Sequence, residues 1–357
     1  MNLSNPKKRY SVKVKLLFGL AILLTCIAIF AFTKKMYQFY LYESHVIPSK
    51  VVYYRNHPLY QKIYRAEKFG LQKKTLSEKI ALLPEEVMNF LFLTKYGNVS
   101  NYSLNSKQKQ LVNNAYTLLP KFLQETIKKH VVRISFVKGY RYSGLCHPSF
   151  TKSGKIYSLI IINAKLLEQS LDEWINEKEN KMFRSSEKDS KGITVSISNR
   201  HSAILAILLH ETAHAFDFNH HITPYTDATT FRVQKDVFIR KHPYTTSAWI
   251  DFRERLDKKK IFTLVRTYQE NIPLHSANKM YTTLIQSPHS SIYGTLNWSE
   301  DFADMVMLDH LVNQMSLQYE ISVRDAKGLT TTYRPLENPR VKKRIKIMHA
   351  EIAKRKK

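Results

Sequence analysis

The chain has 357 residues, of which 43% are hydrophobic and 12% aromatic, so it can bury a sizeable core and wholesale disorder is excluded. Two cysteines, Cys26 and Cys146, are too few for a disulfide framework. The formal net charge of +27 would suit a nucleic-acid-binding protein. However, residues 1–35 carry +7 and residues 338–357 carry +8, which leaves +12 for the 302 residues between them. No nucleic-acid partner is therefore expected.

The first element is an apolar segment without a charged residue, LLFGLAILLTCIAIFAF, at 16–32. Its 17 residues are at the short end of what a transmembrane helix needs. Five basic residues precede it and two follow, which places the N-terminus in the cytoplasm. We therefore expect residues 1–35 to form a basic cytoplasmic stub and a single-pass anchor in the cell membrane, with the remaining chain on the extracytoplasmic side. The alternative is a cleaved signal peptide and a secreted protein.

Residues 36–105 are interpreted as a stalk with accessory helices. The stretch VVYYRNHPLYQKIYRAEKF mixes tyrosines with basic residues, a pattern that can bind single-stranded nucleic acid but that a packed amphipathic helix also produces. LPEEVMNFLFLTKYG at 83–97 predicts a short helix with a proline near its start and a glycine at its end. The pattern of 106–130 is helical, and Pro120 should divide that helix.

The periodicity then changes from helical to extended. VVRISFV at 131–137 and IYSLIIIN at 156–163 are β-branched and aromatic runs that predict strands, with a glycine-containing loop between them. His147 in that loop precedes a proline and is interpreted as a turn residue. This order of elements predicts an α+β fold whose main domain spans 106–320, followed by a basic C-terminal tail at 321–357.

The segment SNRHSAILAILLHETAHAFD predicts a buried helix that carries the pattern HExxH. Ser198 or Asn199 is the expected N-cap. On a helix, His210 and His214 lie on one face about 6 Å apart, which suits two imidazole ligands of one tetrahedral Zn²⁺. Glu211 lies one residue round from His210, where a carboxylate can act as a general base toward a metal-activated water.

Two downstream residues can supply the third protein ligand. His220 matches the last histidine of HExxHxxGxxH, although Asp217 stands where that pattern has the glycine that turns the chain back. The segment SEDFADMVMLDHL predicts a helix that starts near Ser299 and carries Glu300 and, one turn later on the same face, Asp304. A ligand carboxylate followed by a second carboxylate suits a site with two histidines and one glutamate, because the second can accept the free ring N–H of a histidine. We favour Glu300 and keep His220 as the alternative.

HETAHAFD together with YGTLNWSEDFAD resembles the gluzincin zinc metallopeptidases, and within them the anthrax lethal factor-like branch that includes the Pro-Pro endopeptidases. That branch shows HExxHAxD and then Tyr-Gly-x-x-Asn-x-x-Glu-x-Phe-Ala-Glu, and this chain has an aspartate as the final acid. The resemblance implies a zincin-like domain with an HExxH active-site helix and Zn²⁺ as cofactor. The implied ligands are His210, His214 and Glu300. The other implied site residues are Glu211 as base, Tyr293 as hydrogen-bond donor to the tetrahedral intermediate, and Asp304 and Asp217 as supports of the ligands.

The expected function is therefore a membrane-anchored or exported zinc-dependent endopeptidase acting on a protein or peptide substrate. We expect the substrate to extend along an edge strand, with 156–163 as the candidate. The 85 residues between the second histidine and Glu300 predict an insertion in the cleft wall. A glycosylation sequon at 297–299 beside the site favours a bacterial exported protein. The alternatives are a catalytically inactive, zinc-containing surface binding module, and a basic protein that binds nucleic acid or anionic lipid.

Overall fold

The computed structural model describes residues 63, 65–71, 75–93, 97–184, 192–198, 200–223, 244, 272–325 and 327–355. The chain divides into two compact units, Met1–Ile47 and Pro48–Lys357, and every described residue belongs to the second. The expected membrane anchor at 16–32 and most of the segment between the two site motifs lie outside the described residues. Within the described part, no helix has both the length and the hydropathy needed to cross a bilayer.

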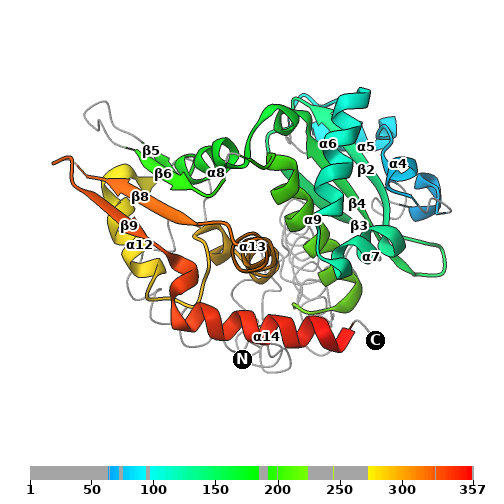
Figure 1. The fold of residues 1–357 in the computed structure, drawn as a ribbon. Helices are drawn as coiled ribbons and strands as arrows, with labels where there is room; N and C mark the ends of the chain where they lie inside the picture. The colour runs from blue at the N-terminus through cyan, green and yellow to red at the C-terminus, as the bar shows by residue number, and fades with distance from the viewer. Residues whose placement is uncertain are drawn as a thin grey trace, which may run out of the picture. The chain divides into compact units, whose positions relative to one another are not determined.

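The second unit combines mixed β-sheets with helices that cover them (Figure 1). Its strands are β1 (Ser100–Asn101), β2 (Val131–Lys138), β3 (Gly144–Phe150), β4 (Ile156–Asn163), β5 (Phe183–Arg184), β6 (Ile193–Ser196), β7 (Ile272–Pro273), β8 (Glu320–Arg324) and β9 (Thr330–Tyr333). Its α-helices are α4 (Leu76–Lys79), α5 (Glu85–Leu93), α6 (Ser106–Thr117), α7 (Lys121–His130), α8 (Leu171–Asn180), α9 (Ala203–His220), α12 (Ala277–Leu284), α13 (Trp298–Asp309) and α14 (Pro339–Arg355). Short helical turns are η1 (Ala66–Phe69), η2 (Ala164–Glu168), η4 (Leu274–Ser276), η5 (Tyr293–Thr295), η6 (His310–Gln314) and η7 (Pro335–Glu337). The α+β class expected from the sequence is confirmed.

The largest described sheet has the strand order β1-β2-β4-β3. β2 and β4 are parallel, and β3 runs antiparallel to β4 at the edge of the sheet. The prediction that 156–163 forms an edge strand is therefore wrong, because β4 is paired on both sides. The interpretation of His147 as a turn residue is also wrong, since it lies within β3 beside Pro148. An edge strand tolerates proline because one side of it makes no ladder hydrogen bonds.

Both faces of this sheet are buried, which explains why β4 is apolar without alternation. Ile160 and Ile162 point into one hydrophobic core, together with residues of α7 and α9. Leu159 and Ile161 point into a second core on the opposite face, which η1 and α5 complete with residues such as Val87. Part of the expected stalk and accessory region therefore packs directly on the main sheet.

Helix α9 is buried along almost its whole length, and in Figure 1 it runs between the four-stranded sheet and α13. Ser202 caps it, and its side chain accepts a hydrogen bond from the Ile204 N–H. The expected cap Ser198 lies too early, because residues 200–202 are not helical, and the other expected cap, Asn199, lies outside the described residues. The helix ends only at His221, which adopts a left-handed conformation with φ of 51°.

The C-terminal residues form part of the same unit and not an appended tail. β8 and β9 extend a sheet that begins with β6, and α14 packs against α13. Val341, Ile345, Met348 and Ile352 form a buried stripe at helical spacing along α14. The basic residues suggest a tail, but Lys342, Lys343 and Lys346 occupy the exposed face of an amphipathic helix, and Arg344 is buried.

Candidate metal centre

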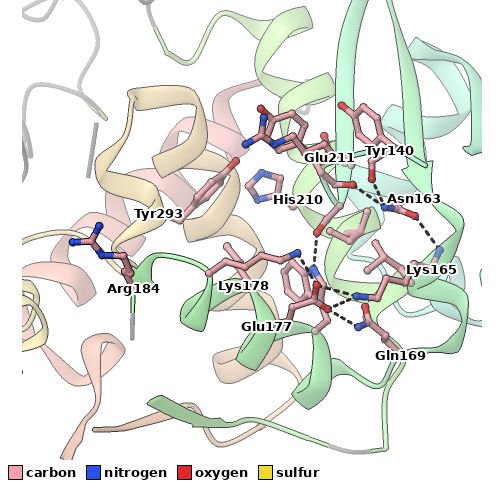
Figure 2. Close-up of a pocket in the computed structure, with 18 residues that line it drawn as sticks. Tyr140, Asn163, Lys165, Gln169, Glu177, Lys178, Arg184, His210, Glu211 and Tyr293 are labelled. Carbon is pink, nitrogen blue, oxygen red and sulfur yellow. Dashed lines mark hydrogen bonds and ion pairs between the residues drawn. The ribbon is translucent and has the colours of Figure 1, made fainter. Parts of the chain in front are cut away.

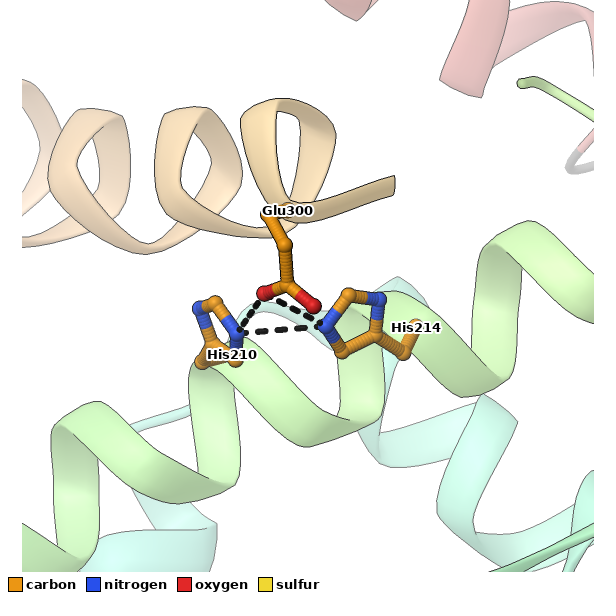
Figure 3. A group of neighbouring side chains, drawn as sticks. All are labelled: His210, His214 and Glu300. Carbon is orange, nitrogen blue, oxygen red and sulfur yellow. Dashed lines mark hydrogen bonds and ion pairs between the residues drawn. The ribbon is translucent and has the colours of Figure 1, made fainter. Parts of the chain in front are cut away.

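Two helices bring three potential metal ligands together (Figure 3). His210 and His214 lie one turn apart on α9, and Glu300 lies in the first turn of α13. Asn297 fixes the start of α13, because its side chain accepts a hydrogen bond of 3.0 Å from the Glu300 N–H. The two histidines are buried, and the Glu300 side chain is 21% exposed.

The donor atoms form a small triangle whose dimensions suit a metal ion. His210 Nε2 lies 3.1 Å from His214 Nε2, and Glu300 Oε2 lies 3.1 Å and 3.3 Å from these two atoms. Tetrahedral Zn²⁺ with bonds of about 2.0–2.1 Å places neighbouring ligand atoms roughly 3.3–3.4 Å apart. Two imidazole nitrogens and a carboxylate oxygen are also a ligand set that zinc accepts. The residues present therefore fit a zinc ion.

The second ring nitrogen of each histidine is already occupied by the protein. The Nδ1–H of His210 donates to Asp304 Oδ1 across 2.9 Å, and His214 Nδ1 shares a hydrogen bond of 2.9 Å with Ser299 Oγ. Partners of this kind fix the orientation of a ligand imidazole and its tautomer. Both Nε2 atoms are thereby directed at the same point.

The charges around the ligands follow from burial and close pairing. Burial opposes ionisation of Glu300, but His214 and His210 hold the pKa of this carboxyl well below its usual range. Burial likewise opposes ionisation of Asp304, yet Lys178 and His210 lower its pKa. Burial disfavours the imidazolium of His210, whereas Asp304 and Glu300 together raise its pKa to about 10. In the metal-free site, His210 thus carries a proton between two carboxylates, and binding of a metal ion to its Nε2 would release that proton.

The Glu211 side chain lines the cleft and is not one of the three residues that could hold the metal ion. Burial raises its pKa, against the pull of the two neighbouring histidines and a hydrogen bond from the Cys146 backbone. Gly144 at the start of β3 leaves the room for this side chain, because a Cβ there would lie 2.4 Å from Glu211 Oε1. A buried carboxylate with a raised pKa, beside a metal site, suits proton transfer.

Tyr293 lies on the opposite side of His210, in η5, and its ring centroid is 5.9 Å from that of His210. The ammonium of Lys178 lies 4.4 Å from the centroid of the tyrosine ring and 3.0 Å from Asp304 Oδ1. Lys178 thus joins Tyr293 to the carboxylate that supports His210. In Figure 2 the phenol points into the cleft beside His210.

The metal centre opens onto a cleft of about 740 Å³ (Figure 2). One wall comes from the segment that connects β2 and β3, and another from α8. His210, Glu211 and Tyr293 line it together. A substrate bound in this cleft would therefore contact His210, the proposed base Glu211 and the Tyr293 phenol simultaneously.

Two other residues expected near the metal are placed elsewhere. His220 stays in α9, where its ring packs 4.3 Å from that of Phe216, because the helix does not turn back after Asp217. Asp217 accepts hydrogen bonds from the backbone N–H and the hydroxyl of Thr223 at 2.7 and 2.5 Å. It therefore ties down the chain after α9, and no ligand histidine donates to it.

Sequence reasoning missed Ser299, Lys178 and Gly144. Ser299 could have been found from its position directly before Glu300, in the same helical turn. The other two come from distant segments, so only the folded arrangement places them. The structure also gives a role to Gly294, since a Cβ there would lie 3.2 Å from Ser291 Oγ, which donates to Asp304.

Comparison with known proteins adds no family to this geometry. No protein-family model matches the chain, and no curated protein or solved structure matches it either. The functional assignment therefore depends on the site itself.

Proposed function

We propose that this chain is a zinc-dependent endopeptidase of the gluzincin type, with His210, His214 and Glu300 as the metal ligands. The observation that carries the proposal is the convergence of these three side chains next to a buried carboxylate, Glu211, at the wall of an open cleft. When bound, zinc supplies a Lewis acid that polarises a scissile carbonyl and activates water. The resemblance of the motifs HETAHAFD and YGTLNWSEDFAD to those of the lethal factor-like branch supports the same assignment.

The chain's own residues then account for the proton and charge movements. Glu211 accepts the proton of the water whose oxygen bonds to the carbonyl carbon, and it delivers that proton to the amine nitrogen as the C–N bond breaks. Tyr293 donates a hydrogen bond to the oxygen on which negative charge develops. Asp304 and Ser299 hold the two imidazoles in place, and Lys178 keeps Asp304 ionised.

We further propose that the substrate lies extended along β3, the edge strand that begins beside Glu211. A strand edge offers backbone hydrogen-bonding groups to any extended peptide, and the residues just before β3 line the cleft. The predicted anchor at 16–32 supports a location at the cell membrane with this cleft on the extracytoplasmic side.

The test is hydrolysis of an unbiased peptide pool by the zinc-loaded full chain, compared with Glu211→Gln. General-base loss should lower turnover by roughly 10²–10⁴-fold while one zinc per chain is kept. Equal cleavage by both proteins would exclude Glu211 as the base. Zinc-loaded wild type without any cleavage would instead indicate a catalytically inactive zinc-containing binding module.

A further inference from the structure

The cleft beside the metal centre has a surplus of positive charge. Five of its lining residues are cationic and two are acidic: Arg141, Lys165, Lys178, Lys181 and Arg184 against Glu177 and Glu211. In a cleft with low-dielectric walls such a surplus raises the local concentration of anionic groups. The question is how much of this charge is already neutralised by the protein.

Part of the charge is committed to internal ion pairs. Glu177 binds two lysines, with Lys165 Nζ at 2.8 Å and Lys181 Nζ at 2.6 Å, and although burial opposes ionisation these pairs lower the pKa of Glu177 to about 2. The single negative charge of Glu177 thus neutralises only one of the two ammonium groups, and one positive charge remains. Lys178 is committed to Asp304.

Arg141 and Arg184 are the uncommitted cations. Both are exposed, and neither has an acidic partner among the residues that the structure describes. The guanidinium of Arg141 lies 6.0 Å from the centroid of the Tyr142 ring, in the segment before β3. An exposed guanidinium next to a cleft can bind a carboxylate with two parallel hydrogen bonds.

These arginines reach the cleft from different segments. Arg141 lies in the segment that connects β2 and β3, and Arg184 lies in β5, which follows α8. Figure 2 shows Arg184 at one side of the view. A peptide in this cleft therefore has guanidinium groups from two separate segments within its binding region.

We infer that the substrate of this site is an acidic peptide. The inference rests on the proposed peptidase function, and it names the chemical class that the cleft selects. The carboxylates come from Asp or Glu side chains or from a chain end. A peptide fits better than a nucleic acid, because the cleft adjoins a strand edge and the ligand set of a hydrolytic metal centre.

Binding tests this inference without requiring turnover. The probe is a fluorescent decapeptide with glutamates at both ends of a neutral centre, compared with its glutamine counterpart, on zinc-loaded full-length Glu211→Gln protein. The acidic peptide should bind roughly tenfold more tightly at low salt, and the preference should shrink as salt is added. An amidated C-terminus separates the two sources of carboxylate, because a side-chain preference survives it.

The arginine variants decide the assignment. Arg184→Ala and Arg141→Ala should each lower the ratio of the two affinities several-fold, and Arg184→Glu should turn the preference toward a lysine-containing peptide. Lys109→Ala removes one exposed charge of α6 outside the cleft and should change neither affinity. Both substituted arginines are exposed, so these variants should fold as wild type does.

Equal affinity for the acidic and glutamine peptides would overturn the inference, as would a preference that both arginine variants retain. Tighter binding of a single-stranded oligonucleotide than of the acidic peptide would also overturn it, in favour of a nucleic-acid ligand. Arginine-dependent binding of the acidic peptide by a wild-type protein that cleaves no peptide would support the inference while contradicting the peptidase proposal.

Discussion

Glu300 and Asp301 are neighbours on α13, but only Asp301 is paired with a cationic arginine side chain. Asp301 faces α14, where Arg344 binds both of its carboxylate oxygens, and His289, from the segment after α12, donates to it from 2.9 Å. Glu300 faces two histidines of α9 and has no arginine or lysine partner among the described residues. The first carboxylate thus has a cation built into the fold. The second sits where an added cation completes the site.

This contrast separates a structural ion pair from a binding site. Arg344 is 1% exposed and Asp301 is fully buried, so neither charge can relax into water. Although burial opposes ionisation, Arg344 and His289 hold the pKa of Asp301 far below its usual range. Such a pair tolerates no missing partner, whereas the Glu300 cluster could hold an added cation.

The largest expected effect comes from breaking the structural pair. Arg344→Ala leaves the buried carboxylate of Asp301 without its partner, so the free energy of unfolding should fall by about 3–5 kcal/mol. Urea denaturation measures this change. Lys346→Ala, an exposed cation of the same helix, is the control and should change stability by less than about 0.5 kcal/mol. Equal stability of the two variants would contradict the structural role of Arg344.

The buried carboxylate of Asp217 extends the comparison, because it has hydrogen-bond donors but no cationic side chain among its described hydrogen-bond partners. Burial raises its pKa from 3.8 to about 6, although Thr223 opposes the shift. The folded protein therefore binds more protons than the unfolded chain between about pH 4 and 6. Stability conferred by the protonated form is present below this window and is lost as the pH rises through it.

We therefore predict that the free energy of unfolding depends differently on pH in metal-free wild type and in metal-free Asp217→Asn. Relative to the variant, wild type should lose on the order of 2 kcal/mol of unfolding free energy between pH 4 and pH 6.5. Denaturant titrations at several pH values measure the slope. Parallel pH profiles for the two proteins would show that Asp217 has an ordinary pKa.

The smallest expected effect concerns the space that keeps Glu211 in position. Gly144→Ala would put a Cβ 2.4 Å from Glu211 Oε1 and 2.9 Å from its Cδ, so the carboxylate must move. Peptide turnover should fall about tenfold, because a general base must stay within hydrogen-bond reach of its proton. Zinc content should stay at one per chain. Gly192→Ala, where a Cβ meets nothing within 4 Å, should leave turnover unchanged, and equal losses in both variants would contradict the account.

The sequence predicted those features that depend on local patterns. The helical face of α9, the strands β2 and β4 and the division of α6 from α7 at Pro120 all follow from periodicity or from one residue's stereochemistry. The three candidate metal ligands followed from two short motifs. Whether 85 intervening residues return Glu300 to the histidines depends on tertiary packing, which the structure supplies through the contact of α13 with α9.

The failures also have physical causes. GLCHPSF has little β-propensity and contains a proline, so β3 was read as a loop, but an edge strand needs fewer hydrogen bonds. The continuous apolar run of β4 indicates burial on both faces and argues against an edge position. In α14 the count of basic residues obscured a buried stripe from Val341 to Ile352. Net charge describes the surface of a segment and not its packing.

The most direct test of the central claim is zinc per chain in the full-length protein, measured by metal analysis after dialysis for wild type, Glu300→Ala and His220→Ala. The account predicts one zinc per chain in wild type and in His220→Ala. Glu300→Ala should lose its zinc, because removing a ligand should lower the affinity for zinc by more than the roughly 10–100-fold that removing a supporting residue costs. Zinc retained by Glu300→Ala and lost by His220→Ala, or a folded wild type that binds none, would contradict it.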